Sequence, residues 1–285
     1  MPSVMTATSK SRIGLRELVI AVASVLLAWA GSAAAHGDAA PTSTASSTAD
    51  EAQMGAQLFK QLKTQREIVK SSPLYDTLRP IADGIRKAVQ PSYPYPIHFY
   101  IVHEAQPNAF AAPGGNIYVV DSLLYFVKNK EELAGTLCHE TAHLLHHDSM
   151  DLMQRNEEIV ARALAATVLL GPTVKTVILA ATISKLDSLH YSRDVEESAD
   201  LTGADICSKA GYNPWGLVWL FQDFSGAQLD EPPEILSDHP DDANRISALK
   251  QHFQQNPGTF ARFSSNPATA TALTPPKNED ENFLR

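Results

Sequence analysis

The chain has 285 residues, of which 44% are hydrophobic and 19% are charged, and its formal net charge is −9 with a pI near 5.5. This composition is typical of a globular protein. A nucleic-acid partner is not expected, because neutralising phosphates needs a clustered basic face and the sequence has none.

The first 35 residues have the pattern of a cleavable signal peptide. Three cations, Lys10, Arg12 and Arg16, precede the apolar run "LVIAVASVLLAWA", and the small residues "GSAAAHG" follow it. The run is shorter than the roughly 20 residues that cross a bilayer as a helix, and the small residues supply an Ala-x-Ala cleavage site. We therefore expect an exported, periplasmic protein, with an uncleaved membrane anchor as the alternative.

Residues 36–49 are small and polar, and we expect them to form a flexible spacer. From Asp50 onward apolar residues recur at a spacing of three to four, which predicts a helix that ends before Pro73. A second helix is expected over residues 74–89, because three prolines in "QPSYPYP" prevent its continuation.

Two short segments rich in β-branched and aromatic residues predict strands. They are residues 97–104, "IHFYIVHE", and residues 116–120, "NIYVV", with a turn at Gly114-Gly115 between them. Asn129, followed three residues later by Glu132, is then expected to cap a helix that runs to about residue 148.

Residues 159–186 are almost wholly apolar but are interrupted by Gly171-Pro172, and each half is too short to span a membrane. They are interpreted as two helices over the core, with a flap or a peripheral membrane-contacting hairpin as the alternative. Three further helices are expected in "SLHYSRDVEESADLTGADICSKAG", "NPWGLVWLFQDF" and "SDHPDDANRISALKQHF". The organisation is therefore one domain over residues 50–254 and a polar, disordered tail over residues 255–285.

The two cysteines, Cys138 and Cys207, are too few to form a disulfide framework. Because Cys138 lies in a predicted helix, both are interpreted as buried apolar residues. A Cys138–Cys207 bridge remains possible.

The segment "HETAH" carries the chemistry. His139 and His143 are four residues apart, so on a helix they point from one face toward a common metal ion. Glu140 lies between them and could deprotonate a water at that metal. The alternative is a histidine-rich helix surface, because a catalytic zinc site needs a third protein ligand.

A third ligand is available in "EESAD". The metzincin pattern fails, because positions 146 and 149 are His146 and Ser149 instead of glycine and histidine. Glu196 on a later predicted helix is the other solution, and Asp200, one turn further, could accept a hydrogen bond from a ligand histidine. A solvated carboxylate face remains the alternative for this helix.

Four motifs in this order, "NAFAAPGGNIYVV", "HETAH", "YSRDVEESAD" and "SDHPDDANRISAL", resemble the HtpX/BepA-like zinc endopeptidases, the gluzincin group that includes the CAAX prenyl proteases. The resemblance covers residues 50 to about 250. It implies an α+β, mostly helical, zincin-like fold with a small β-sheet beside the metal helix. It also implies one Zn²⁺ per chain, held by His139, His143 and Glu196. Glu140 would be the catalytic base, and Asp200 would accept a hydrogen bond from a ligand histidine.

The resemblance adds residues that spacing does not single out. Asn116, Ile117, Tyr118 and Val119 match an edge strand along which an extended substrate could add as another strand. His239 matches a histidine close to the metal, where it would stabilise the oxyanion or occupy the open zinc position and keep the enzyme latent. Arg245 matches an arginine that braces the cleft.

Three histidines and a tyrosine near these motifs are not expected to bind the metal. His146 and His147 are interpreted as surface residues or residues adjacent to the site, since a fourth histidine ligand would close it. His190 and Tyr191 are weak candidates for hydrogen bonding in the transition state.

The resemblance, together with export, implies a cell-envelope endopeptidase that degrades misfolded or unassembled proteins. A zinc-bearing, chaperone-like client-binding module and a processing protease with a single client are the alternatives. Two departures from relatives are expected, namely that long transmembrane helices and a C-terminal helical repeat array are lacking. Client recognition would then depend on the cleft, on residues 159–186 or on a partner.

Overall fold

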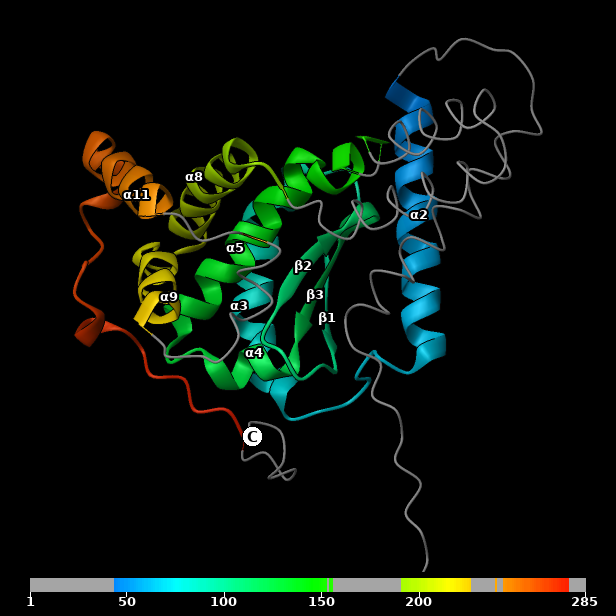
Figure 1. Cartoon of the computed structure of the whole chain (residues 1–285), viewed down its shortest axis with the longest axis horizontal. Helices are drawn as coiled ribbons and strands as arrows, with labels where there is room; N and C mark the ends of the chain where they lie inside the picture. The colour runs from blue at the N-terminus through cyan, green and yellow to red at the C-terminus, as the bar shows by residue number, and fades with distance from the viewer. Residues whose placement is uncertain (1–43, 153, 156–190, 227–238, 240–242, 277–285) are drawn as a thin grey trace, which may run out of the picture.

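The computed structural model describes residues 44–152, 154–155, 191–226, 239 and 243–276 (Figure 1). Within them the chain is mostly helical and contains one three-stranded sheet, which confirms the predicted α+β class. None of the helices in these ranges is long and apolar enough to cross a membrane. The predicted signal peptide and the apolar segment 159–186 lie outside the described residues.

The sheet has the strand order β1-β3-β2. Strand β1 (His98–Val102) runs parallel to β3 (Asn116–Val120), and β2 (Ala109–Ala112) is antiparallel to β3. The sequence predicted β1 and β3 but missed β2, whose four residues include three alanines and therefore carry little strand signal. All five residues of β3 are buried, because β3 is the central strand and is covered on both faces.

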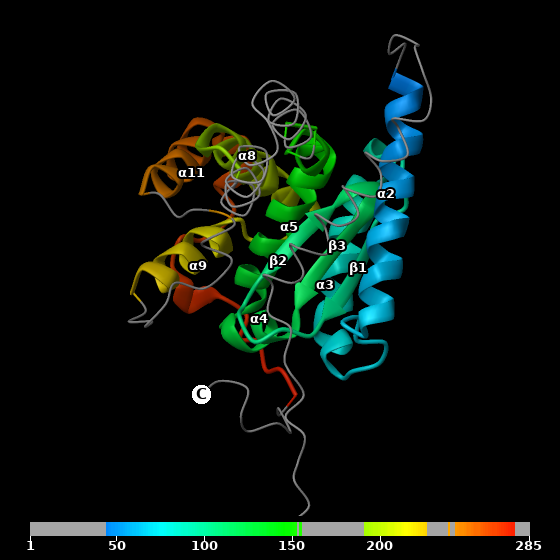
Figure 2. The same ribbon diagram turned by 45° about the vertical axis from the view of Figure 1, so that its right-hand side comes forward.

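One face of the sheet is covered by helix α2 (Thr44–Gln65), which lies to the right of the sheet in Figures 1 and 2. Leu58 and Leu62 of α2 pack against Tyr118 and Val120. The helix begins at Thr44, inside the segment predicted to be a spacer.

The opposite face packs on α3 (Leu74–Val89), which has the bounds that the sequence predicted, and on α5 (Lys130–His146). The short helix α4 (Asp121–Phe126) follows β3. As expected, the Asn129 side chain caps α5 by accepting from the Glu132 amide at 2.9 Å. Helix α5 runs beside the sheet through the centre of the molecule (Figure 1).

A third layer lies beyond α5 and contains α8 (Arg193–Ala210), α9 (Trp215–Gly226) and α11 (Ala243–Gln255) (Figure 1). At the crossing of α5 and α8, a Cβ atom on Gly203 would lie 3.1 Å from the Cα of His139, so this glycine lets the two helices approach closely. Cys138 and Cys207 join the same two helices in a disulfide, with their Cα atoms 5.7 Å apart. The interpretation of both cysteines as unbridged apolar residues is therefore wrong.

The chain after α11 does not agree with the predicted disordered tail. Helix α12 (Pro257–Phe260) and the 3-10 turn η3 (Pro267–Thr269) follow α11. Two similar 3-10 turns occur earlier in the chain, η1 (Gln90–Ser92) and η2 (Pro113–Gly115). Phe260 is buried against Phe253 of α11. The amide of Leu273 then bonds to the carbonyl of Lys128, so the segment up to residue 276 packs back on the domain.

Candidate active site

Helix α5 brings three functional side chains into the interior. His139, Glu140 and His143 are at most 4% exposed. The four-residue spacing of the histidines places them on one face, and their Nε2 atoms lie 3.0 Å apart. The histidine-rich surface that the sequence left open is therefore excluded for these two residues.

Two more side chains converge on the same point. Glu196, on the first turn of α8, places its carboxylate 3.4 Å from His139 Nε2 and 3.5 Å from His143 Nε2. His239 adds its Nδ1 atom, 3.3 Å from His139 Nε2 and 2.8 Å from Glu196 Oε1. One nitrogen or oxygen from each of these four buried residues lies within 4.8 Å of the others.

This arrangement fits a tetrahedral metal ion. Zinc binds imidazole nitrogen and carboxylate oxygen at about 2.0–2.2 Å, so atoms at neighbouring corners of its tetrahedron are about 3.3 Å apart. The five separations given above lie between 2.8 and 3.5 Å, and all four ligand atoms lie within 4.8 Å of one another. Glu196 Oε2 is also buried and accepts no hydrogen bond from a described residue, although the Arg245 guanidinium lies 3.0 Å away as an ion-pair partner.

The ligand histidines are held from behind by carboxylates. His139 Nδ1 lies 3.0 Å from Asp200 Oδ1, and His143 Nδ1 lies 2.8 Å from Asp148 Oδ2. A carboxylate at Nδ1 keeps the proton there and directs the Nε2 lone pair toward the metal. The contact with Asp200 agrees with the sequence prediction, whereas Asp148 was missed.

Arg245 ties the acidic groups together. Its guanidinium donates two 2.7 Å bonds to the carboxylate of Asp200 and lies 3.0 Å from Glu196. It also donates to the backbone carbonyl of His239 at 3.2 Å, while stacking over the ring of Phe221. One side chain of α11 therefore fixes a metal-facing carboxylate and the backbone of His239.

The electrostatics of the site favour a positive charge. Burial disfavours the charged form of His139, but Asp200 and Glu196 outweigh it and raise the pKa of His139 to about 10. Burial also opposes ionisation of the two acids. His239 and the other histidines nevertheless hold the pKa of Glu196 well below its usual range, and Arg245 does the same for Asp200. Ionised carboxylates around two imidazoles are what a divalent cation needs.

Glu140 lies between this cluster and the sheet. Its Oε2 accepts a 2.8 Å hydrogen bond from the amide of Ala111 in β2, and its Oε1 lies 3.5 Å from His239 Nε2. The same Oε1 is buried and has no hydrogen-bond partner among the described residues. This oxygen is available to take a proton from a water at the metal.

The predicted substrate strand needs a correction. Asn116, Ile117, Tyr118 and Val119 belong to β3, which has a neighbour on each side, so their backbone groups cannot pair with a substrate. The strand with a free edge beside the metal helix is β2. There the amide of Ala111 meets Glu140, and its carbonyl accepts from the Ser149 hydroxyl at 2.9 Å.

The remaining residues that the sequence singled out lie around the site. His146 contacts Thr202 at 3.1 Å, and His147, which ends α5, contacts Glu51 at 2.8 Å. Neither joins the metal-facing cluster. Tyr191 stacks on the ring of His143, with centroids 4.4 Å apart, and its hydroxyl lies 3.0 Å from Ser149 Oγ. His190 lies outside the described residues.

Comparison with known proteins agrees with this geometry. The beta-barrel assembly-enhancing protease of Yersinia pestis is 28% identical over 174 residues, which are 55% of this chain and 36% of the relative. The protein of that name from Escherichia coli K12 is 23% identical over 220 residues, 73% of this chain and 45% of the relative. The mitochondrial metalloendopeptidase OMA1 of Schizosaccharomyces pombe is 26% identical over 154 residues, which are 53% of this chain and 45% of the relative.

The chain spans less than half the length of these curated relatives. Residues 76–252, more than half of the chain, match the model of peptidase family M48. The motifs that mark the resemblance are also those that the fold brings together around the metal-facing cluster. The chain therefore belongs to peptidase family M48, in the HtpX/BepA-like group of metalloendopeptidases.

Proposed function

We propose that this chain is a zinc-dependent endopeptidase of the cell envelope that cleaves misfolded or unassembled proteins. One observation carries the proposal: His139, His143 and Glu196 converge at metal-binding distances beside a buried Glu140. Three protein ligands of these types are what a catalytic zinc site requires, and a glutamate next to them has no role in a site that only binds.

In the proposed reaction Glu140 transfers the protons, and Asp200 and Asp148 orient the two ligand histidines. Zinc would supply a Lewis acid that polarises the peptide carbonyl and makes a water acidic. Glu140 takes the proton of the attacking water on Oε1, which accepts no hydrogen bond from a described residue, and later delivers it to the leaving amine. Asp200 and Asp148 keep the two imidazoles oriented throughout, since each contacts the Nδ1 atom of one of them.

The substrate backbone is proposed to lie along the free edge of β2 in place of the predicted β3. Ala111 directs its amide and carbonyl to that edge, next to Glu140. Main-chain pairing of this kind tolerates many sequences, which suits an enzyme that takes unfolded clients. The substrate competes with Glu140 for the amide of Ala111 and with Ser149 for its carbonyl.

His239 is proposed to act as a latch. Its Nδ1 atom lies at ligand distance from His139 and Glu196, so it occupies the fourth position, which catalysis needs for water. The alternative is stabilisation of the oxyanion in the transition state. The latch predicts more proteolysis by His239→Ala, whereas an oxyanion role predicts loss. An unchanged rate contradicts both.

Two features support export to an oxidising compartment, the periplasm. The N-terminal 35 residues have the pattern of a signal peptide, and the Cys138–Cys207 disulfide is of a kind that persists outside the reducing cytosol. Two of the compared relatives are named for enhancing β-barrel assembly. Envelope proteins that fail to fold or assemble are therefore the proposed substrates.

The proposal is tested by incubating the zinc-loaded chain with casein, beside Glu140→Gln and a chelator-treated sample. Cleavage by the wild type alone is expected. If the protein binds zinc but neither the wild type nor His239→Ala cleaves casein, the endopeptidase proposal fails in favour of client holding. Cleavage restricted to one envelope protein would instead indicate a processing protease.

A further inference from the structure

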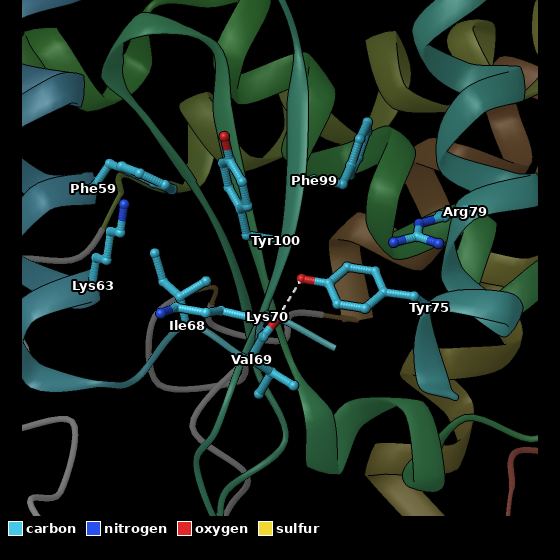
Figure 3. Close-up of a pocket in the computed structure, with 9 residues that line it drawn as sticks. All are labelled: Phe59, Lys63, Ile68, Val69, Lys70, Tyr75, Arg79, Phe99 and Tyr100. Atoms are coloured by element: carbon cyan, nitrogen blue, oxygen red, sulfur yellow. Dashed lines mark hydrogen bonds between the residues drawn. The ribbon is translucent and has the colours of Figure 1, made fainter. Parts of the chain in front are cut away.

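A cavity of about 370 Å³ lies at the edge of the sheet formed by β1, on the opposite side of the sheet from the metal-facing strand β2 (Figure 3). It is lined by residues of α2, of α3, of β1 and of the segment that joins α2 to α3. None of its lining residues takes part in the active site. The cavity therefore needs an explanation of its own.

The cavity lies at the part of the outer edge of β1 whose backbone groups form no hydrogen bonds with the described residues. Ile101 directs its backbone outward, where its carbonyl accepts from the Val69 amide at 2.8 Å and its amide donates to the Tyr75 hydroxyl at 3.0 Å. Two residues earlier on the same edge, Phe99 also faces outward, because alternate residues of a strand share an edge. No described residue bonds to that amide or carbonyl.

Aromatic rings flank this open edge on both faces of the sheet. On the α2 side, Tyr100 packs against Phe59, with ring centroids 4.9 Å apart. On the α3 side, Phe99 and Tyr75 line the cavity (Figure 3). Phe59, Phe99 and Tyr100 are only partly buried. A strand entering the cavity would place alternate side chains against each of these two aromatic surfaces.

The cavity is also positively charged. Its lining contains Lys63, Lys70 and Arg79 and no carboxylate, in a chain whose net charge is −9. All three cations are exposed, and none forms an ion pair with a described residue. Figure 3 shows Lys63 and Lys70 on the side of Phe59 and Arg79 on the side of Tyr75, so both faces of the open edge carry positive charge.

We propose that this cavity is a docking site for an extended acidic segment of a partner protein, which adds to β1 as a further strand. The free backbone groups of Phe99 supply main-chain hydrogen bonds, and the aromatic surfaces accept apolar side chains. Lys63, Lys70 and Arg79 attract the carboxylates. A small anion would use the cations but would leave the strand edge and both aromatic surfaces unused.

This site is independent of the proposed peptidase activity, because β2 and β1 are opposite edges of one sheet. A partner held at β1 leaves the edge beside Glu140 free. A partner bound at β1 would hold the enzyme in place while the other edge takes substrate.

The test uses the full chain carrying Glu140→Gln, so that the probe is not cleaved, and a fluorescein-labelled peptide EDFFED. As a strand, this peptide presents one phenylalanine flanked by carboxylates on each face. Fluorescence anisotropy is expected to show binding that the combined change Lys63→Glu, Lys70→Glu and Arg79→Glu weakens at least tenfold. The same reversal at three exposed lysines elsewhere, Lys87, Lys130 and Lys209, is the matched control.

Hydrogen exchange reports the strand pairing. The amide of Phe99 is expected to exchange more slowly when EDFFED is bound and to be unaffected by the basic peptide KKFFKK. The proposal is overturned if the cavity variant binds as tightly as the control variant, if Phe99 gains no protection, or if KKFFKK binds equally well. Self-association without peptide, lost in the cavity variant, would assign the site to a second copy of the chain.

Discussion

At the scale of single residues, each of the two ligand histidines has a carboxylate beside its Nδ1 atom. Asp200 contacts His139 Nδ1 at 3.0 Å, and Asp148 contacts His143 Nδ1 at 2.8 Å. Asp200 comes from α8 and is fixed by Arg245, whereas Asp148 follows α5 directly and also lies 3.6 Å from His146. Both contacts fix the tautomer that a metal ligand needs.

Replacing Asp148 by alanine is therefore expected to weaken zinc binding about 10- to 100-fold, the range measured for carboxylates behind ligand histidines. Asp148→Asn should fall in between, because the amide oxygen still accepts a hydrogen bond but carries no charge. Affinity is measured by competition with a chromophoric chelator. Asp205→Ala, which removes an exposed carboxylate paired with His252, is the control, and an equal affinity in both alanine variants contradicts the role of Asp148.

The sequence could predict those residues of the site that helical spacing or the family resemblance identifies, but no others. The four-residue interval identifies His139 and His143, because helical periodicity alone brings them together. His239 is 100 residues from His139, so only the resemblance pointed to it. Asp148 lies five residues after His143, beyond the helix end at His146, so no helical periodicity predicts that contact.

At the scale of secondary-structure elements, the sheet shows where a local pattern was sufficient and where it was not. After Asn116, "NIYVV" alternates no polar residues with its apolar ones, which is the pattern of a strand covered on both faces, and β3 is such a strand. Its assignment as the edge strand came from the resemblance and was wrong. The edge strand beside the metal helix, "AFAA", is too short and too rich in alanine to be recognised before its pairing with β3 is known.

The disulfide between α5 and α8 could not be predicted for a related reason. Cys138 and Cys207 are 69 residues apart, and pairing them requires the packing angle of two helices. The bridge is adjacent to His139, so it fixes the helix of two ligands to the helix of Glu196. It therefore contributes both to global stability and to the alignment of the metal site.

Removing this bridge by Cys138→Ala and Cys207→Ala is expected to lower the free energy of unfolding by up to about 4 kcal/mol, the chain-entropy value for a loop of this length. Urea unfolding of the oxidised proteins measures the difference. A non-thiol reductant should destabilise the wild type to a similar extent and leave the double variant unchanged. If the wild type and the variant share one unfolding midpoint without reductant, the bridge does not stabilise the domain.

At the scale of the whole molecule, the domain extends beyond the helix that the sequence took as its last. The side chain of Trp219 on α9 donates to the carbonyl of Ser265, and the side chain of Glu131 on α5 accepts from the amide of Thr271. Arg262 donates to the carbonyl of Ser208 at 2.7 Å. These contacts join the segment after α11 to α5, α8 and α9. The proline-rich composition suggested a disordered tail because backbone contacts of this kind leave no apolar periodicity in the sequence.

The segment after α11 is therefore expected to be required for a stable domain. A chain that ends at residue 276 keeps all of these contacts, whereas a chain that ends at Gln255 loses them and also the buried ring of Phe260. Loss of that ring alone should cost about 3–5 kcal/mol, so Phe260→Ala in the longer chain should reproduce much of the effect of the truncation. Thermal unfolding compares the three proteins. Equal midpoints for the chains ending at 255 and 276 would mean that residues 256–276 only lie on a core that is complete without them.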